Sequence, residues 1–335
     1  MSHAGPRNHG KMRSLREYEA PAWATNYLRA GRLEPGERVL VVVDEPLAEE
    51  GAALATSVLE AGGRPQLELW AGERPFSEPP PAVAAAAEEA DLCIFISQEP
   101  RSDEAGARIR LNDIVRGRGG RELYSGLVDS TLLREEMSRP APDLERPARS
   151  LLDQLEGRET VRVTAPGGTD LTFRIGDRRW QTDCAPIEAG EFHNYPHGEV
   201  FVSPLEDGAE GVLVADLTVP YTVDGLVDAP VELRFAGGSV TSIEGGEAAR
   251  MLRELVEETG DSGRVIAELG IGLNQSIKPF GHVLFDEKAG GTAHVAIGNN
   301  TGLYGGLNES PIHVDCVFSA PEIEADGSPV ELPSA

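Results

Sequence analysis

The residues best suited to chemistry lie between positions 291 and 315, in GTAHVAIGNNTGLYGGLNESPIHVD. His313 and Asp315 are two residues apart in an apolar, β-branched segment. Because side chains alternate along a strand, both would project from one face and offer a metal ion one nitrogen and one oxygen. Two alternatives stay open: an HxD triplet also occurs without a metal, and His294, in GTAHVAIG, is equally a hydrogen-bonded histidine at a strand end.

Two carboxylates stand in unusual surroundings. Glu268 interrupts the apolar VIAELGIGLN, where a buried carboxylate needs a cation or a metal ion. Glu199 precedes the strand-like VFV in NYPHGEVFVSP, and an exposed acid in a turn is the alternative reading. By contrast, Asp286 and Glu287 in FDEKAGG are expected to be solvated, with Lys288 pairing with one of them.

These candidates share oxygen or imidazole nitrogen as ligand atoms and need no thiolate. Such a set suits zinc, cobalt or manganese, and it suffices for two ions that share a bridging carboxylate. The candidate ligands are Glu199, Glu268, His294, His313 and Asp315.

Composition restricts the classes of partner. The chain has 335 residues and a net charge of −26, which repels nucleic acid and anionic membranes. The same charge favours cationic ligands such as a free amino group, or it serves solubility alone. Hydrophobic residues make up 40% and aromatic residues 5%, so the cores must rely on Leu, Val, Ile and Ala.

Cysteine spacing and hydropathy give no indication of a disulfide framework or of a membrane span. The three cysteines are far apart and form no CxxC pair, which argues against a zinc ribbon or a disulfide framework. No apolar stretch approaches the ~20 residues of a membrane span, and the polar start MSHAGPRNHGKM lacks the apolar core of a signal peptide. These features predict a cytoplasmic protein.

The elements of the first half alternate between strand and helix. Strands are expected at 38–44, 66–70 and 92–96, with helices from Pro46 to Gly62 and over 81–90. This alternation predicts an α/β N-terminal domain with a parallel sheet over 1–145, and the absence of GxGxxG argues against a dinucleotide site. A helical stretch at 128–137 leads to a Pro-rich segment, 138–150, that is either a linker or a loop before another helix.

The second half is rich in strands. ETVRVTAPGGTDLTFRI predicts two strands around a turn, GVLVADLTVPYTV and VELRFAGGSVTSIEGG predict further strands, and 247–260 is an amphipathic helix. We therefore expect a β-rich α+β C-terminal domain over 155–325 that carries the metal site, followed by a frayed tail from Glu324.

The order and spacing of these residues resemble a known family. Glu199 in PHGEVF, Glu268 in AELGIGLN, the block from Asp286 to His294 and the His313-Val314-Asp315 triplet are similar to the thermophilic metallo-aminopeptidases, the aminopeptidase T and S group. The resemblance covers most of residues 194–318. It implies a two-metal site with the five ligands above, hydrolysis of N-terminal residues from peptides or small amine-bearing substrates, and a homodimer.

The resemblance also implies catalytic roles, with one departure. Glu268 would serve both metal binding and proton transfer, and Glu287 would be a second candidate base. Members of the family carry a catalytic tyrosine seven residues after the first histidine, where this chain has Thr301. Tyr304 is the nearest tyrosine and the proposed proton donor to the oxyanion.

A ring-cleaving branch of the same superfamily gives the main alternative. The iron-dependent 2,5-dihydroxypyridine dioxygenases share the GxGL segment and the HxD triplet but have histidine where this chain has Glu268. Because two histidines and one carboxylate are the usual ligands of non-haem iron, the retained Glu199 and Glu268 favour a two-metal hydrolase. A catalytically degenerate metal-binding homologue is the third hypothesis.

Overall fold

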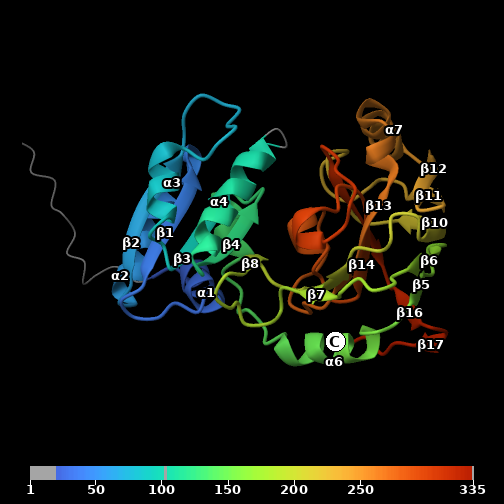
Figure 1. The fold of residues 1–335 in the computed structure, drawn as a ribbon, viewed down its shortest axis with the longest axis horizontal. Helices are drawn as coiled ribbons and strands as arrows, with labels where there is room; N and C mark the ends of the chain where they lie inside the picture. The colour runs from blue at the N-terminus through green and yellow to red at the C-terminus, as the bar shows by residue number, and fades with distance from the viewer. Residues whose placement is uncertain (1–19, 102–103, 334–335) are drawn as a thin grey trace, which may run out of the picture.

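Long apolar runs and alternating strands divide the chain between one parallel sheet and two antiparallel sheets, as the computed structural model shows (Figure 1). The structure describes residues 20–101 and 104–333, so the polar N-terminal segment 1–12 lies outside the described residues. Among the helices that it describes, none is both long and apolar enough to cross a membrane.

The parallel sheet forms from the apolar runs of the first half. All its neighbouring strands run parallel, and one face is covered by α1 (Ala22–Ala30), α2 (Ala48–Glu60) and α5 (Ser130–Glu135), the other by α3 (Pro81–Ala87) and α4 (Ala105–Gly117). A short 3₁₀ turn, η2 (Glu45–Leu47), leads into α2. The strand order is β2 (Arg64–Trp70), β1 (Arg38–Asp44), β3 (Leu92–Ser97), β4 (Arg121–Gly126) and β8 (Phe192–Asn194). Since α4 carries arginines between its apolar positions, its pattern was not evident from the sequence.

The two antiparallel sheets share one apolar core, which also includes α6 (Glu145–Leu155) and α7 (Glu247–Thr259). The larger sheet has the order β12 (Ser239–Glu244), β11 (Val231–Ala236), β10 (Ala209–Ala215), β6 (Asp170–Arg174), β5 (Thr160–Thr164), β16 (Glu322–Ala325) and β17 (Ser328–Pro329). The smaller sheet has the order β15 (His313–Ser319), β14 (Thr292–Gly298), β13 (Ile266–Gly272), β9 (Glu199–Val202) and β7 (Gln181–Thr182). The predicted fold class, an α/β part followed by a β-rich part, is confirmed.

Short helical turns complete the second half. They are η4 (Asp261–Arg264), α8 (Val283–Asp286) and η5 (Gly302–Tyr304). Leu284 and Phe285 of α8 are buried in the apolar cluster on the α1 and α2 face of the parallel sheet. The turn α8 therefore connects the parallel-sheet half to the antiparallel half.

Two segments differ from or refine the expectation. Helix α6 begins at Glu145, so the Pro-rich stretch is a loop before another helix. The tail is not frayed as a whole, because β16 and β17 pair with each other across a turn in which Asp326 and Gly327 have φ of 48° and 74°. Two successive positive φ values are typical of the type I′ turn that Asp-Gly favours, a signal that the prediction of fraying overlooked.

The predicted domain ranges, 1–145 and 155–325, stay a prediction. Helix α6 packs in the core of the antiparallel half and lies below that half in Figure 1. Strand β8, at Phe192–Asn194, pairs with β4 of the parallel sheet although it comes from the second range. The chain thus returns once to the first sheet after entering the antiparallel half.

Candidate metal centre

Four neighbouring strands of the smaller sheet carry the five predicted ligands. His313 and Asp315 belong to β15, His294 to β14, Glu268 to β13 and Glu199 to β9. In the strand register Ala296 faces both Glu268 and Asp315, and Gly298 faces His313. Because residues opposite one another share a face, all five side chains project from the same face of the sheet.

Small residues make room for them. Gly270 lies opposite His294, and a Cβ atom at Gly270 would fall 2.0 Å from the imidazole Cε1 atom. The ring of His294 therefore lies across the β13 backbone, and only glycine permits this approach. A register shift between Ile266 and Glu268 marks a β-bulge, a device that re-aims the side chain next to it.

The ligand atoms form two groups that share Glu268. In the first group, Nε2 of His294 lies 3.5 Å from Oε2 of Glu199 and 3.6 Å from Oε1 of Glu268. In the second, Nε2 of His313 lies 3.1 Å from Oε2 of Glu268 and 3.2 Å from Oδ1 of Asp315. Each group offers two carboxylate oxygens and one imidazole nitrogen, with Glu268 placed to bridge them.

Hydrogen bonding fixes the orientation of His313. Its Nδ1 lies 2.7 Å from the carbonyl oxygen of Asn299, and since a carbonyl only accepts, Nδ1 must donate. The lone pair or proton of Nε2 is then directed at Glu268 and Asp315. Such an outer contact holds a histidine in the orientation that a metal ion requires.

The carboxylates and imidazoles shift one another's pKa values. Burial opposes the charge on His294, but Glu268, Glu199 and Asp315 raise its pKa to about 10. Burial raises the pKa of Asp315, but His313 outweighs this and lowers it to about 2. Burial and neighbouring carboxylates raise the pKa of Glu199 to about 8 in spite of Lys288. This mutual perturbation is typical of functional sites.

The prediction that the DEK segment is solvated was wrong, whereas the expected pairing of Lys288 with one of the acids is confirmed, since its Nζ lies 2.9 Å from Glu287. Asp286, Glu287 and Lys288 are all buried, with Lys288 at 0% exposure. Asp286 accepts hydrogen bonds from the backbone of Phe280 and Gly281. The physical reason is that α8 anchors in an apolar cluster through its Leu and Phe side chains, which draws the adjoining charged residues inside the protein.

The sequence left open whether Glu199 is a buried ligand or an exposed acid in a turn. It is the first residue of β9 and is 6% exposed, so the alternative of an exposed turn acid is excluded. Its Oε1 accepts from Nζ of Lys288 at 2.5 Å. Its Oε2 is buried and has no hydrogen-bond partner among the described residues.

Three polar residues of the centre were missed by the sequence-based reasoning. Asp183 is 4% exposed, accepts from the backbone of Gly198 and Glu199 through Oδ1, and places Oδ2 3.6 Å from Lys288. The rings of His193 and His197 lie nearby, with their centroids 5.4 Å apart. Burial is the main cause of the lowered pKa of both histidines, to about 4 for His197. QTDCAP carries no periodic signal that could have indicated Asp183.

Two tyrosines, Tyr304 and Tyr221, lie near the candidate ligands. The position where the family carries its catalytic tyrosine is Thr301 in this chain. The ring of Tyr304 stacks on His313 with centroids 4.7 Å apart and planes at 15°. Tyr221 is 62% exposed, has a φ of 63°, and lies within electrostatic reach of Asp315 and His313. Burial and nearby carboxylates raise the pKa of Tyr304 well above its usual value, so its hydroxyl keeps its proton.

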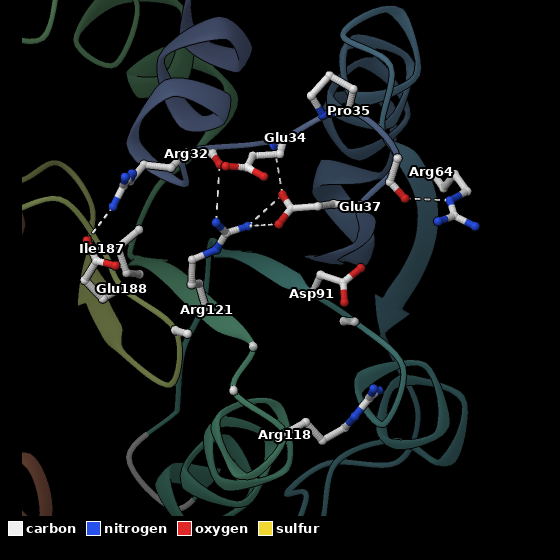
Figure 2. Close-up of a pocket in the computed structure, with 15 residues that line it drawn as sticks. Arg32, Glu34, Pro35, Glu37, Arg64, Asp91, Arg118, Arg121, Ile187 and Glu188 are labelled. Atoms are coloured by element: carbon white, nitrogen blue, oxygen red, sulfur yellow. Dashed lines mark hydrogen bonds and ion pairs between the residues drawn. The ribbon is translucent and has the colours of Figure 1, made fainter.

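A cavity of about 310 Å³ opens onto the centre. Glu199, Glu268 and Tyr304 are among its lining residues, together with the apolar Phe192 and Phe201. A larger cavity, of about 630 Å³, lies at the N-terminal ends of the parallel strands (Figure 2). Two of its four arginines pair with two of its four acids, Arg121 with Glu37 at 2.7 Å and Arg32 with Glu188 at 2.5 Å. The candidate chemistry therefore belongs to the smaller cavity.

The centre fits divalent metal ions. Two ligand groups with the oxygen and nitrogen donors that zinc, cobalt and manganese accept lie within 4.8 Å each. The Oε2 atom of Glu199, buried without a hydrogen-bond partner among the described residues, faces the first group. A buried acceptor of this kind is costly unless a cation satisfies it.

Comparison with known proteins agrees with this geometry. Residues 143–332 match the family described as thermophilic metalloprotease (M29). The chain is 32% identical to aminopeptidase AmpS of Bacillus subtilis over 182 residues, which cover 48% of this chain and 43% of that protein. It is 26% identical to aminopeptidase T of Thermus thermophilus over 333 residues, covering 92% of this chain and 76% of that protein.

A solved structure shares the whole fold. That of 2,5-dihydroxypyridine dioxygenase from Pseudomonas putida KT2440 has a TM-score of 0.73 and 20% sequence identity, and the match covers 93% of this chain and 94% of that chain. At this identity the likeness concerns the fold alone. The sequence is also 26% identical over 207 residues to 2,5-dihydroxypyridine 5,6-dioxygenase of Pseudomonas putida, covering 58% of each chain, so both predicted branches of the resemblance are confirmed. Since the family match spans more than half of the sequence, the chain belongs to the thermophilic metalloprotease (M29) family.

Proposed function

We propose that the protein is a metal-dependent aminopeptidase that removes N-terminal residues from peptides. The observation that supports this most directly is the pair of ligand groups joined by Glu268 at the end of a cavity. Glu199, Glu268 and His294 would hold one divalent ion, and Glu268, His313 and Asp315 a second. When bound, such ions polarise a carbonyl group and lower the pKa of water towards ~7.

The acids of the cavity suit a substrate with a free amino group. Asp183 and Glu191 line it together with Glu199 and Glu268, so its field attracts an α-ammonium ion. Phe192 and Phe201 offer apolar contact to the first side chain of a peptide. The substrate would then lie with its first peptide bond towards Glu268 and Tyr304.

The protein groups would divide the proton transfers. Burial raises the pKa of Glu268, but the hydrogen bonds and charges of His294 and His313 outweigh this and lower it, so its carboxylate is ionised and able to accept a proton. Tyr304 keeps its proton and would donate a hydrogen bond to the developing oxyanion. Glu287 is held by Lys288 at 2.9 Å, which makes it a less mobile second candidate for the base.

The test combines metal content with turnover. Metal-free protein is reconstituted separately with zinc, cobalt, manganese and anaerobic iron, and bound metal is measured by elemental mass spectrometry before assay on aminoacyl and peptide substrates. We expect two ions per chain and release of free N-terminal residues, with metal content falling in Glu199→Ala and Glu268→Ala.

Other outcomes would identify the alternatives. A single iron with oxygen uptake on a dihydroxypyridine would support ring cleavage in place of hydrolysis. Bound metal without turnover on any substrate would support a degenerate binding protein. The cytoplasmic location and the homodimer remain predictions, and size-exclusion chromatography with light scattering tests the second.

A further inference from the structure

Lys288 is a fully buried cation at the edge of the candidate metal centre. It is 0% exposed, and its Nζ lies 2.5 Å from Glu199, 2.9 Å from Glu287 and 3.6 Å from Asp183. Its position is tightly packed, because a Cβ atom at Gly198 would fall 2.8 Å from the Cβ of Lys288. The side chain therefore has little freedom to withdraw from Glu199.

The two ligand groups are equal in donor type but not in surroundings. Each consists of two carboxylates and one imidazole, and they share Glu268. In the group with His294, however, one oxygen of Glu199 is already occupied by the ammonium of Lys288. In the group with His313, the outer contact of the imidazole is the neutral carbonyl of Asn299.

We propose that Lys288 makes the two metal positions unequal, by weakening metal binding at the position formed by Glu199, Glu268 and His294. The lysine occupies Oε1 of Glu199, so that carboxylate has only Oε2 left for a metal ion, and it places a fixed positive charge beside the position, which opposes a second cation. At the position formed by Glu268, His313 and Asp315, Lys288 occupies no donor oxygen. Its charge acts on Asp315 without an ion-pair contact, so we expect a smaller effect there. Lys288 is thus a positioning residue whose effect is on metal affinity.

The inference rests on the metal site of the proposed function but not on peptide hydrolysis. It is tested by titrating chelator-treated protein with cobalt(II), following heat and visible absorption. We expect two steps, the second at least about tenfold weaker. Because two neighbouring ions repel each other whichever binds first, the steps are assigned with His294→Ala, which should lose the weaker step, and His313→Ala, which should lose the tighter one.

The decisive variant is Lys288→Met, which keeps the length of the side chain and removes its charge. It should tighten the weaker step at least about tenfold and change the tighter step by less than about threefold. Arg74→Met is the matched control, since Arg74 neutralises the fully buried Glu104 in the parallel-sheet half at 2.5 Å. It should lower stability and leave both steps unchanged.

Several results would overturn the inference. These are equal steps in the unmodified protein, loss of the tighter step in His294→Ala, or a weaker step that is unchanged or weakened in Lys288→Met. If Lys288→Met does not fold, Lys288→Gln takes its place with the same expected result, and the two histidine variants still show which position is the weaker one. Unequal binding without peptide turnover would remove the aminopeptidase and leave this inference standing, whereas turnover with two equal sites would do the reverse.

Discussion

Two cavities of the molecule are rich in charge, and they differ in balance. The cavity at the N-terminal ends of the parallel strands is lined by four arginines and four acids, and Glu37 accepts two hydrogen bonds from one Arg121 nitrogen at 2.7 Å (Figure 2). In the metal centre, Lys288, His294 and His313 face a larger number of carboxylates. These are Asp183, Glu199, Glu268, Glu287 and Asp315.

The difference shows which property marks a site of chemistry. The balanced cavity is about twice as large, yet its four arginines match its four acids in number, and two pairs of them are in direct contact. The candidate metal centre buries five carboxyl groups beside three cationic or imidazole groups, an excess of acidic groups that bound metal ions would compensate. Volume and charge alone are therefore poor guides, and the imbalance of buried charge is the informative property.

The largest effect is expected from removing the shared carboxylate. Glu268→Gln keeps the size of the side chain but removes the charge that both ligand groups use, so kcat should fall at least about 10³-fold. Steady-state hydrolysis of an aminoacyl substrate measures it. Glu37→Gln in the balanced cavity should stay within about threefold of the unmodified protein, and a comparable loss in both variants would remove the distinction between the cavities.

Metal removal should destabilise the protein through the same surplus of charge. At a free metal concentration about 100-fold above Kd, each site adds about 2.7 kcal/mol to the free energy of unfolding. Thermal unfolding with and without a chelator should therefore differ by several degrees. His313→Ala should shrink this difference and Glu37→Gln should preserve it, while a chelator without effect on the unmodified protein would contradict a metal-dependent centre.

Substitution of the two tyrosines tests which of them acts on the substrate. Tyr304→Phe should lower kcat about 10- to 100-fold with little change in KM, because the hydroxyl acts only on the transition state. Tyr221→Phe is the matched variant from a different loop and should retain most activity. The reverse outcome would transfer the proton donor to Tyr221.

The smallest effect concerns an uncompensated carboxyl in the parallel sheet. Glu122 is 2% exposed, and burial raises its pKa to about 8. Between its usual pKa near 4.5 and 8, the folded state holds a proton that the unfolded state has released, so stability falls as pH rises.

Glu122→Gln should abolish that contribution. Relative to the unmodified protein, the variant should gain on the order of 1–2 kcal/mol at pH 8 and little at pH 4.5. Denaturant unfolding across this range measures the difference. Equal gains at both pH values would mean that Glu122 acts through packing and not through its charge.

The sequence predicted much of the fold where signals are local. The buried strands β1 and β3 match their apolar runs, and helix α7 ends at Thr259, before Gly260, within one residue of its predicted end. The prediction failed where tertiary packing overrides a rule based on local sequence. The charged DEK segment reads as solvated, but α8 carries it into the interior.

The sequence by itself determined which side chains are available as ligands and that His313 and Asp315 share a face, because strand alternation is a local property of the backbone. Only the tertiary structure decided that Glu199 joins them, that Gly270 admits the ring of His294, and that Lys288 and Asp183 are inside. Those contacts join residues far apart along the chain, and the strand pairing that creates them depends on the packing of the whole sheet.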